Sequence, residues 1–193
     1  MNLRAERGAA TRERVVAIAR RLFAEHGYEG TSIEAVLHES GLSRGALYHH
    51  YAGKDALFEA VLEAVEAEVG RAIIASVRGV DDPRRALVTG CLEWVRLAGD
   101  PVVRRIVLID APSVLGWERW RAMEERYAFG MLKAALQATK AVPEEFADLH
   151  AHMLLAAINE SALLVARGGD PEAAAAEAAV EDFLHRVLGP ATA

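Results

Sequence analysis

Apolar side chains recur at helical spacing along most of the chain, and capping residues separate one stripe from the next. The first stripe contains Val15, Ile18 and Leu22, follows Thr11 and stops at Gly27. The pattern predicts further helices at residues 31–41, 43–51, 55–76, 83–98, 101–109, 117–139, 143–167 and 171–188. Because no alternating run of β-branched residues and no hairpin dipeptide occurs, we predict an all-α fold of about nine helices.

The dipeptide Asp-Pro marks three of the predicted helix starts, at residues 82–83, 100–101 and 170–171. Asp caps the first turn, and Pro at the first helical position lacks only an amide hydrogen that would have no partner there. Residues 109–116 contain a proline and a glycine and are expected to break the helix that precedes them.

Residues 27–54, GYEGTSIEAVLHESGLSRGALYHHYAGK, predict two short helices joined by a tight turn. Thr31 and Glu34 are expected to form a capping box before the first helix, and Ser43 is expected to cap the second. Gly41 can adopt the left-handed conformation that the turn requires. The segment is typical of a helix-turn-helix.

The second of these helices is unusual for a core element, because it is expected to bury mainly Leu47. Small residues near its start permit close approach to a groove. Arg44 suits a bidentate contact with guanine, and the Ala46 methyl suits a thymine methyl. The side chains placed to reach phosphates are those of Tyr48, His50 and Lys54. The alternative interpretation is a helical hairpin whose polar face is merely solvated.

Four sequence elements follow one another at fixed distances: FAEHGY at residues 23–28, GTSI at 30–33, LYHHY at 47–51 and GKDAL at 53–57. In this order they resemble the DNA-binding domain of the tetracycline-repressor (TetR) family. The resemblance is close over about residues 11–58 and loose over the rest of the chain.

The resemblance implies a three-helix DNA-binding domain at residues 1–54 and an all-α ligand-binding and dimerisation domain at residues 55–193. Thr31 and Ser32 are implied to lie near phosphate. The full set of implied DNA-binding positions is Thr31, Ser32, Ser43, Arg44, Gly45, Ala46, Tyr48, His49, His50 and Lys54. The chain departs from the family pattern at Gly53, where Ser often caps the fourth helix, and at Tyr51, which replaces the commoner Phe.

The net charge of −6 conceals an asymmetry along the chain. Residues 1–54 contain eight Lys or Arg and six Asp or Glu, a net of +2, together with four of the seven His. Residues 55–193 contain fourteen Lys or Arg and twenty-two Asp or Glu, a net of −8. A basic end on an acidic body suits a protein that approaches DNA phosphates with that end.

Several other classes of protein are not favoured. The longest stretch without Asp, Glu, Lys or Arg, Leu149 to Asn159, has eleven residues, whereas a membrane span needs about 20 apolar residues. No apolar run opens the chain, so we expect no signal peptide and a cytoplasmic protein. Cys91 is the single cysteine, which excludes an internal disulfide. No phosphate-binding loop, paired catalytic carboxylates or His-Glu-x-x-His motif is present, so neither an enzyme nor a cofactor or metal is expected.

The tryptophans and several other polarisable side chains gather in two predicted helices. The candidate ligand-binding residues are Cys91, Trp94, Trp117, Trp120, Met123, Tyr127 and Met131. Such residues can line a cavity for a flat or apolar ligand, or they can simply fill a core. The expected break at residues 109–116 would form the mouth of the pocket, where Arg104, Arg105 and Asp110 are either polar anchors or solvated surface residues.

The last two predicted helices carry long apolar faces. Their members are Phe146, Leu149, Met153, Ala157, Ser161 and Leu164, then Val180, Phe183, Leu184 and Val187. These faces either pair within one chain or form a four-helix bundle with a second copy. A homodimer would also provide the paired recognition helices that a palindromic operator in double-stranded DNA requires.

Three functions follow from these patterns. The first is a DNA-binding regulator, by base rate a repressor, released from its operator by a small apolar or aromatic effector. The second is a DNA-binding regulator without a small-molecule ligand. The third is a helical small-molecule-binding protein that does not bind DNA. The sequence does not identify the ligand, the operator or the regulated genes.

Overall fold

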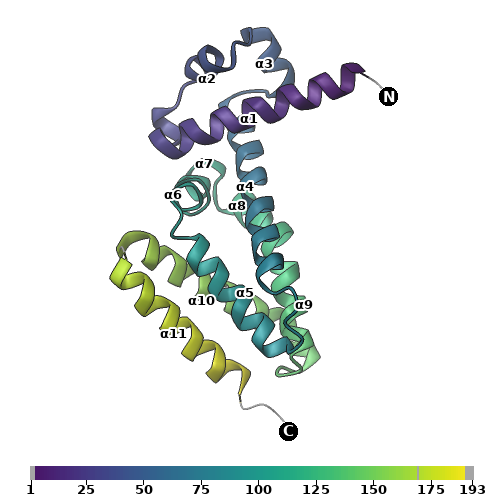
Figure 1. Cartoon of the computed structure of the whole chain (residues 1–193), viewed down its shortest axis with the longest axis vertical. Coiled ribbons are helices and arrows are strands. Elements are labelled where there is room, and N and C mark those ends of the chain that lie inside the picture. The colour runs from purple at the N-terminus through teal and green to yellow at the C-terminus, as the bar shows by residue number, and fades with distance from the viewer. Residues whose placement is uncertain (1–2, 169, 190–193) are drawn as a thin grey trace. The chain divides into compact units, whose positions relative to one another are not determined.

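The computed structural model describes the backbone of residues 3–168 and 170–189, and the side chains of residues 8–165 and 175–189. Within these ranges the chain forms helices and no strands (Figure 1), as predicted from the hydrophobic pattern. The helices are α1 (Leu3–Gly30), α2 (Ile33–Ser40), α3 (Arg44–His50), α4 (Lys54–Ser76), α5 (Pro83–Leu97), α6 (Pro101–Val103), α7 (Ala111–Leu115), α8 (Trp117–Glu124), α9 (Gly130–Ala138), α10 (Ala147–Gly168) and α11 (Asp170–Leu188).

Short irregular helical turns join some of these segments. A π-helical turn, η1 (Arg104–Asp110), joins α6 to α7, and a second, η2 (Glu125–Phe129), joins α8 to α9. A 3-10 turn, η3 (Glu144–Phe146), leads into α10. When directly joined segments are taken together, the described residues form nine helical stretches, in agreement with the predicted number.

The helix starts predicted from Asp-Pro are confirmed where the structure describes the side chains. Asp82 accepts a hydrogen bond from the amide of Arg84 at 3.0 Å, before α5. Asp100 accepts from the amides of Val102 and Val103 at 2.8 and 3.2 Å, before α6. α11 begins at Asp170 as expected, although the capping side chain itself lies outside the described residues.

The break predicted at residues 109–116 occurs only at the last of them, and the rest of the prediction is wrong. The chain stays helical through η1 and α7 as far as Leu115 and turns only at Gly116, whose φ is 75°. The proline in this segment occupies the second position of α7, directly after the π-helical turn. At the start of an α-helical segment the missing amide hydrogen of proline costs no helical hydrogen bond, so Pro112 does not end the helix.

The chain divides into two compact units. The first contains residues 1–66 and 105–120, and the second contains residues 67–104 and 121–193. In the first unit, the fully buried rings of Phe23 and Phe58 meet edge to face with centroids 5.2 Å apart. The first unit thus includes residues 105–120, which are far along the sequence from the helix-turn-helix. A functional boundary at residue 54 stays a prediction.

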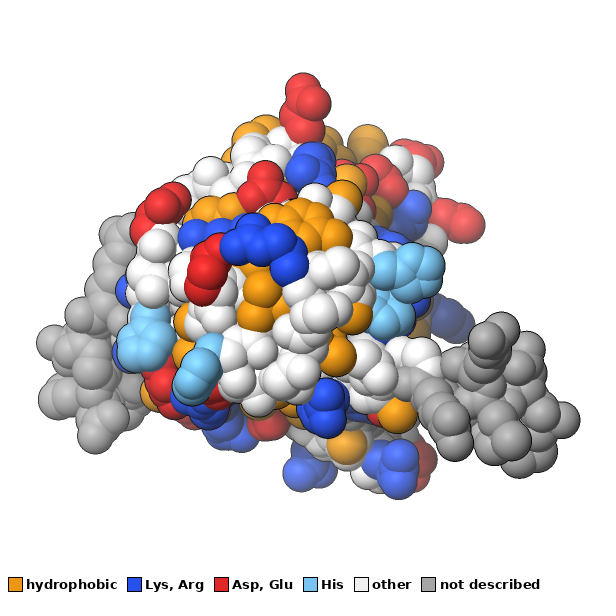
Figure 2. Space-filling view, turned by 90° about the horizontal axis from the view of Figure 1, so that it is seen from above, with side chains coloured by type: hydrophobic (Ala, Val, Ile, Leu, Met, Phe, Trp, Pro, Cys, Tyr) orange, Lys and Arg blue, Asp and Glu red, His pale blue; other side chains and the backbone are white. Residues whose placement is uncertain are grey.

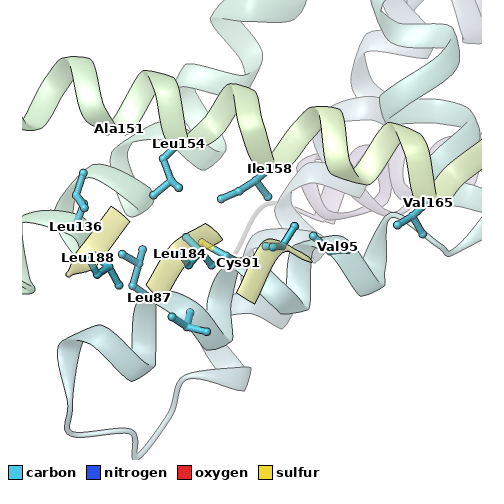
Figure 3. Packing of buried hydrophobic residues seen from close by; sticks show 12 residues of the cluster. Leu87, Cys91, Val95, Leu136, Ala151, Leu154, Ile158, Val165, Leu184 and Leu188 are labelled. Carbon is cyan, nitrogen blue, oxygen red and sulfur yellow. The ribbon is translucent and has the colours of Figure 1, made fainter. Parts of the chain in front are cut away.

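The second unit has its own hydrophobic core (Figure 3). Helix α10 packs against α11, and both pack against α5, while α9 contacts α5 and α10. The core residues labelled in the figure are Leu87, Cys91, Val95, Leu136, Ala151, Leu154, Ile158, Val165, Leu184 and Leu188. Among the helices that the structure describes, none has the length and apolar character needed to cross a membrane.

Candidate functional site

Two capped helices and a glycine turn form the helix-turn-helix. The Ser32 hydroxyl oxygen accepts a hydrogen bond from the Ala35 amide at 3.1 Å and caps α2. Gly41 ends α2 in the left-handed conformation, with φ 66° and ψ 16°, as predicted. The Ser43 hydroxyl oxygen accepts from the Ala46 amide at 3.2 Å and caps α3, also as predicted. Local sequence therefore determines both helix starts and the turn between them.

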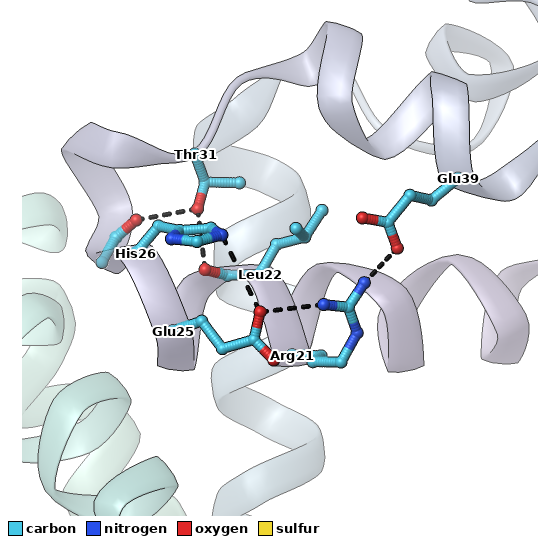
Figure 4. Close-up of polar contacts among 7 residues, drawn as sticks. Arg21, Leu22, Glu25, His26, Thr31 and Glu39 are labelled. Carbon is cyan, nitrogen blue, oxygen red and sulfur yellow. Dashed lines mark hydrogen bonds and ion pairs between the residues drawn. The ribbon is translucent and has the colours of Figure 1, made fainter.

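The capping box predicted at Thr31 is wrong, because the cap is one residue later, at Ser32. Thr31 is only 3% exposed, and its hydroxyl lies 2.8 Å from the carbonyl oxygen of Gly27 and 3.0 Å from that of Leu22 (Figure 4). The helical dihedral angles of α1 are interrupted at Gly27, so carbonyl groups there need donors from elsewhere. The Thr31 hydroxyl supplies one and is thereby engaged inside the protein.

Charged side chains join α2 to α1. The Arg21 guanidinium contacts the carboxylates of Glu25, on its own helix, and of Glu39, near the end of α2 (Figure 4). Arg14 donates to the carbonyl oxygen of Ser40 at 2.9 Å. Exposed ion pairs contribute little individually, but together these contacts set the position of the turn relative to α1.

Helix α3 has the exposure pattern expected of a recognition helix. Leu47 is the only buried residue among its seven residues, while Ala46 and His50 are partly exposed. The exposed predicted contacts in and beside these two helices are Ser32, Ser43, Arg44, Gly45, Tyr48 and His49. No atom lies within 4 Å of the place that a Cβ on Gly45 would take, so the backbone there is open to a ligand. Figure 2 looks onto this end of the chain and shows histidine, lysine and arginine side chains there, with acidic and hydrophobic side chains among them.

Two predicted DNA contacts already have partners in the free chain. Arg44 Nη2 lies 2.5 Å from Glu34 Oε1, and both side chains are exposed. A hydrogen bond from its own backbone amide, followed by the Arg44 guanidinium, lowers the pKa of Glu34. Lys54, in the first turn of α4, has its ammonium nitrogen 4.0 Å from the centroid of the Tyr28 ring. Both cations are held near the surface in defined positions.

The two departures from the family pattern have simple structural consequences. Tyr51 is 4% exposed, and its hydroxyl lies 3.5 Å from the carbonyl oxygen of Arg12, so the extra oxygen has a partner inside the first unit. The Gly53 carbonyl accepts the amide of Leu57 at 3.1 Å, as an N-cap residue does, although glycine provides no capping side chain.

The predicted ligand-binding residues lie in different surroundings. Cys91 is 5% exposed and packs in the core of the second unit, where burial raises its pKa to about 12. Trp94 is partly buried on α5, next to the same core. In the first unit, Trp120 is 8% exposed and its indole nitrogen has no acceptor in the described structure, whereas Trp117 is 66% exposed. On the second unit, Met123 is buried, and Tyr127 and Met131 are partly exposed.

A buried polar network in the second unit was not anticipated from the sequence. Trp94 Nε1 donates to Asn159 Oδ1 at 3.0 Å, and Asn159 Nδ2 donates to Glu124 Oε1 at 2.5 Å. Arg121 Nη1 lies 3.4 Å from the other Glu124 oxygen. Burial raises the pKa of Glu124, against smaller lowering effects of Arg121 and Asn159. Asn159 is a polar residue within an otherwise apolar stretch of α10, and that pattern could have marked it as unusual. Its partners Trp94 and Glu124 are remote in sequence and could not have been predicted.

A second missed feature involves Asp110, which the sequence offered as a polar anchor at a pocket mouth. The residue is 7% exposed and accepts hydrogen bonds from the Tyr28 amide at 2.8 Å and from Arg105 Nε at 3.1 Å. The contact with Tyr28 spans 82 positions of sequence. No local pattern could reveal it.

A capped helix-turn-helix with an exposed recognition helix, in an otherwise all-α chain, defines a DNA-binding transcription regulator. The family model for bacterial regulatory proteins of the tetR family matches residues 15–61, and the model for the tetracyclin repressor-like C-terminal domain matches residues 84–190. The chain belongs to the TetR family of DNA-binding transcriptional repressors, which are regulators and not enzymes.

Two curated relatives are repressors. The HTH-type transcriptional repressor AcnR of Corynebacterium glutamicum is 34% identical over 119 residues, which cover 54% of this chain and 60% of AcnR. An HTH-type transcriptional repressor of Mycobacterium tuberculosis is 29% identical over 168 residues, or 87% of this chain and 89% of that protein.

Solved structures share the fold over the whole chain. A TetR-family transcriptional regulator of Pectobacterium atrosepticum has a TM-score of 0.82 and 29% identity, covering 99% of this chain and 100% of that one. RolR, solved in complex with the ligand resorcinol, has a TM-score of 0.70 and 17% identity and covers 98% of each chain. The second likeness concerns the fold alone.

Proposed function

We propose that this chain is a homodimeric repressor that binds a palindromic operator and is released from it by a small apolar or aromatic effector. The observation that carries the DNA-binding part is the exposure of α3, which buries Leu47 alone and presents its other side chains. Arg44, Gly45 and Ala46 are proposed to contact bases, and Ser32, Tyr48, His50 and Lys54 to contact phosphates. Thr31 is proposed to support the start of α2 from inside.

Exposed apolar side chains on α10 and α11 support the dimer. Leu149, Met153 and Leu164 of α10 are 56–58% exposed in the single chain, and Phe183 of α11 is 40% exposed. An open groove between the two helices is lined by Ala157, Ile158, Ser161, Ala179, Val180 and Phe183. Large exposed apolar side chains that follow one helix face are typical of an interface between protein chains.

Two features support an effector. The buried Glu124 and Asn159 and the partly buried Trp94 form a hydrogen-bonded polar group inside the second unit. A largely apolar ligand site uses a few polar groups of this kind for orientation. In the other unit, the buried indole N–H of Trp120 has no acceptor among the described residues, which a ligand oxygen would satisfy. RolR, which has this fold, binds an aromatic diol. These features make phenols the first compounds to test.

The DNA-binding proposal is tested by selecting duplexes from a random-sequence library with the purified chain. We expect selection of a palindrome, with two chains bound to each duplex in analytical ultracentrifugation. Recovery of no sequence above background would contradict DNA recognition and favour the helical small-molecule-binding alternative.

The effector proposal is tested with the selected duplex and a panel of phenols that includes resorcinol. We expect at least one compound to raise the melting temperature and lower duplex affinity together. Trp94→Phe and Trp120→Phe keep an aromatic ring but are smaller and lack the indole N–H, so a weaker response in one variant points to the tryptophan near the bound compound. A panel without effect on either measurement favours a regulator without a ligand of this class.

A further inference from the structure

Asp110 connects two segments of the first unit that lie far apart in sequence. Its carboxylate is 7% exposed and accepts hydrogen bonds from the backbone amide of Tyr28 and from the side chain of Arg105. A buried carboxylate is stable only with hydrogen-bond donors and a nearby positive charge. The Tyr28 amide and the Arg105 guanidinium supply the donors, and the guanidinium also supplies the charge. Its position is therefore well defined.

The backbone that Asp110 contacts is not ordinary helix. Gly27 has φ 72° and ψ 174°, which interrupts the helical geometry of α1 just before Tyr28. The Arg105 guanidinium lies against this glycine, since a Cβ built on Gly27 would lie 1.8 Å from Arg105 Nη2. Arg105 and Asp110 thus both contact the non-helical backbone near the end of α1. Arg105 packs against Gly27, and Asp110 accepts a hydrogen bond from the Tyr28 amide.

Tyr28 in turn contacts the elements around the recognition helix. Its ring stacks with Phe23, centroids 5.9 Å apart, and meets Phe58 of α4 edge to face at 5.2 Å. Its hydroxyl donates to Asp55, and the Lys54 ammonium lies 4.0 Å from its centroid. The first turn of α4, which follows the recognition helix after a short link, is therefore built directly on Tyr28.

The segment that carries Asp110 is attached to the regulatory part of the chain. Residues 105–120 fall within the match to the C-terminal family model, yet they pack in the unit that contains the helix-turn-helix. Both ends of the segment continue directly into the second unit, at Arg104 and at Arg121. η1, which contains Arg105 and Asp110, is a π-helical turn, and such turns concentrate at functional sites.

We propose that Asp110 is a positioning residue for DNA recognition, which fixes Tyr28 and, through the first turn of α4, the recognition helix α3 that precedes it. The proposal rests on the proposed DNA-binding function and extends it. A change that withdraws Asp110 releases the Tyr28 amide and weakens DNA binding.

The test compares three substitutions on the duplex that the unaltered chain selects from a random library. Asp110→Ala removes the acceptor. Asp110→Asn keeps a carbonyl oxygen for the Tyr28 amide, removes the charge and replaces the other oxygen by an NH2 group. Arg105, with a side chain 41% exposed, can offset the lost charge by contacts with water. Asp81→Ala is the control, because it removes one exposed aspartate from the loop before α5. Each variant is also measured on a random duplex and by thermal melting.

We expect Asp110→Ala to lose at least tenfold in affinity for the selected duplex while its affinity for the random duplex changes less than threefold. Asp110→Asn and Asp81→Ala are expected to stay within threefold of the unaltered chain on both duplexes. If Asp110 had a purely structural role, Asp110→Ala would instead lower the melting temperature and reduce the affinity for both duplexes equally. Unchanged affinity of Asp110→Ala for the selected duplex, or equal losses on the two duplexes, would overturn the proposal.

A measurement on the unaltered chain keeps the proposal testable if Asp110→Ala does not fold. If the state in which Asp110 accepts from the Tyr28 amide binds DNA more tightly, then bound DNA must stabilise that hydrogen bond by the same free energy. We expect hydrogen exchange of the Tyr28 amide to slow at least tenfold on the selected duplex, and an unchanged rate overturns the proposal. Failure of the unaltered chain to select any duplex would overturn the proposed function itself.

Discussion

Arg44 and Glu34 form an ion pair between the first turn of the recognition helix and the first turn of the helix before it. Because both side chains are exposed, the pair contributes little to stability and can open when DNA presents a guanine edge to Arg44. We expect Arg44→Ala to cost roughly 1–3 kcal/mol at one operator position and to relax base preference there. Binding to a series of operators substituted one base pair at a time measures this effect. A uniform loss at every position would identify Arg44 as a phosphate contact.

Lys54 should behave differently, because it is predicted to contact phosphate. Lys54→Ala is expected to reduce the affinity for selected and random duplexes alike. It should also reduce the slope of log affinity against log salt concentration by about 0.9. Lys140→Ala, at an exposed lysine of the second unit, is the matched control for the loss of one positive charge. An unchanged salt slope in Lys54→Ala would place Lys54 away from the DNA backbone.

The sequence predicts best what short-range chemistry determines. The caps at Ser43, Asp82 and Asp100 and the left-handed turn at Gly41 all depend on residues within a few positions of one another. The shift of the α2 cap from Thr31 to Ser32 shows the limit of this approach. Both residues can cap, and the choice depends on the carbonyl groups at the interrupted end of α1.

The features that the sequence could not predict depend on contacts between distant segments. Asp110 and Tyr28 are 82 positions apart, and Trp94 and Asn159 are 65 apart. Proline and glycine in residues 109–116 suggested a loop, but η1 allows the helix to continue until Gly116. Of the candidate ligand residues, Cys91 packs in a core and Trp117 is exposed, which their types and spacing do not distinguish.

The dimer prediction depends on the exposed apolar stripe of α10. Leu164→Glu is expected to convert a dimer into monomers at micromolar concentration, because a charge would enter a dry interface without a partner. Leu164 is 56% exposed in the single chain, so the same substitution should leave the fold of the monomer intact. Sedimentation velocity measures the change, with Gln137→Glu on the exposed face of α9 as the control. A dimer that persists in Leu164→Glu would mean that the chains pair elsewhere.

The Cys91 thiol should be inert in the folded chain. Burial raises its pKa from an ordinary 9.0 to about 12, so the thiolate is scarce near neutral pH. The stability gained by keeping this proton is present below pH 9 and is lost as the pH rises toward 12. We expect alkylation by iodoacetamide at pH 8 to occur only at the rate of unfolding. Rapid stoichiometric alkylation at 25 °C, without loss of the helical circular dichroism signal, would be incompatible with the buried position.

The buried Glu124 leads to a prediction of opposite sign, in which a substitution stabilises the protein. Burial raises the pKa of this carboxyl above its ordinary value of 4.5, so the ionised form destabilises the fold at neutral pH. The protonated Glu124 carboxyl therefore contributes stability below pH 4.5, and this contribution is lost as the pH rises through the pKa of the folded state. Glu124→Gln has the same shape, keeps an oxygen to accept from Asn159, and carries no charge.

We therefore expect Glu124→Gln to melt at a higher temperature than the unaltered chain at pH 7 and at nearly the same temperature at pH 4. A gain of about 1 kcal/mol corresponds to roughly 2–4 °C for a chain of this size. Glu125→Gln, which removes an exposed neighbouring carboxylate, is the control and should change little at either pH. A lower melting temperature for Glu124→Gln at pH 7 would show that the ion pair with Arg121 outweighs desolvation. In that case Glu124 would be a structural anchor of the second unit rather than a polar group held there at a cost in stability.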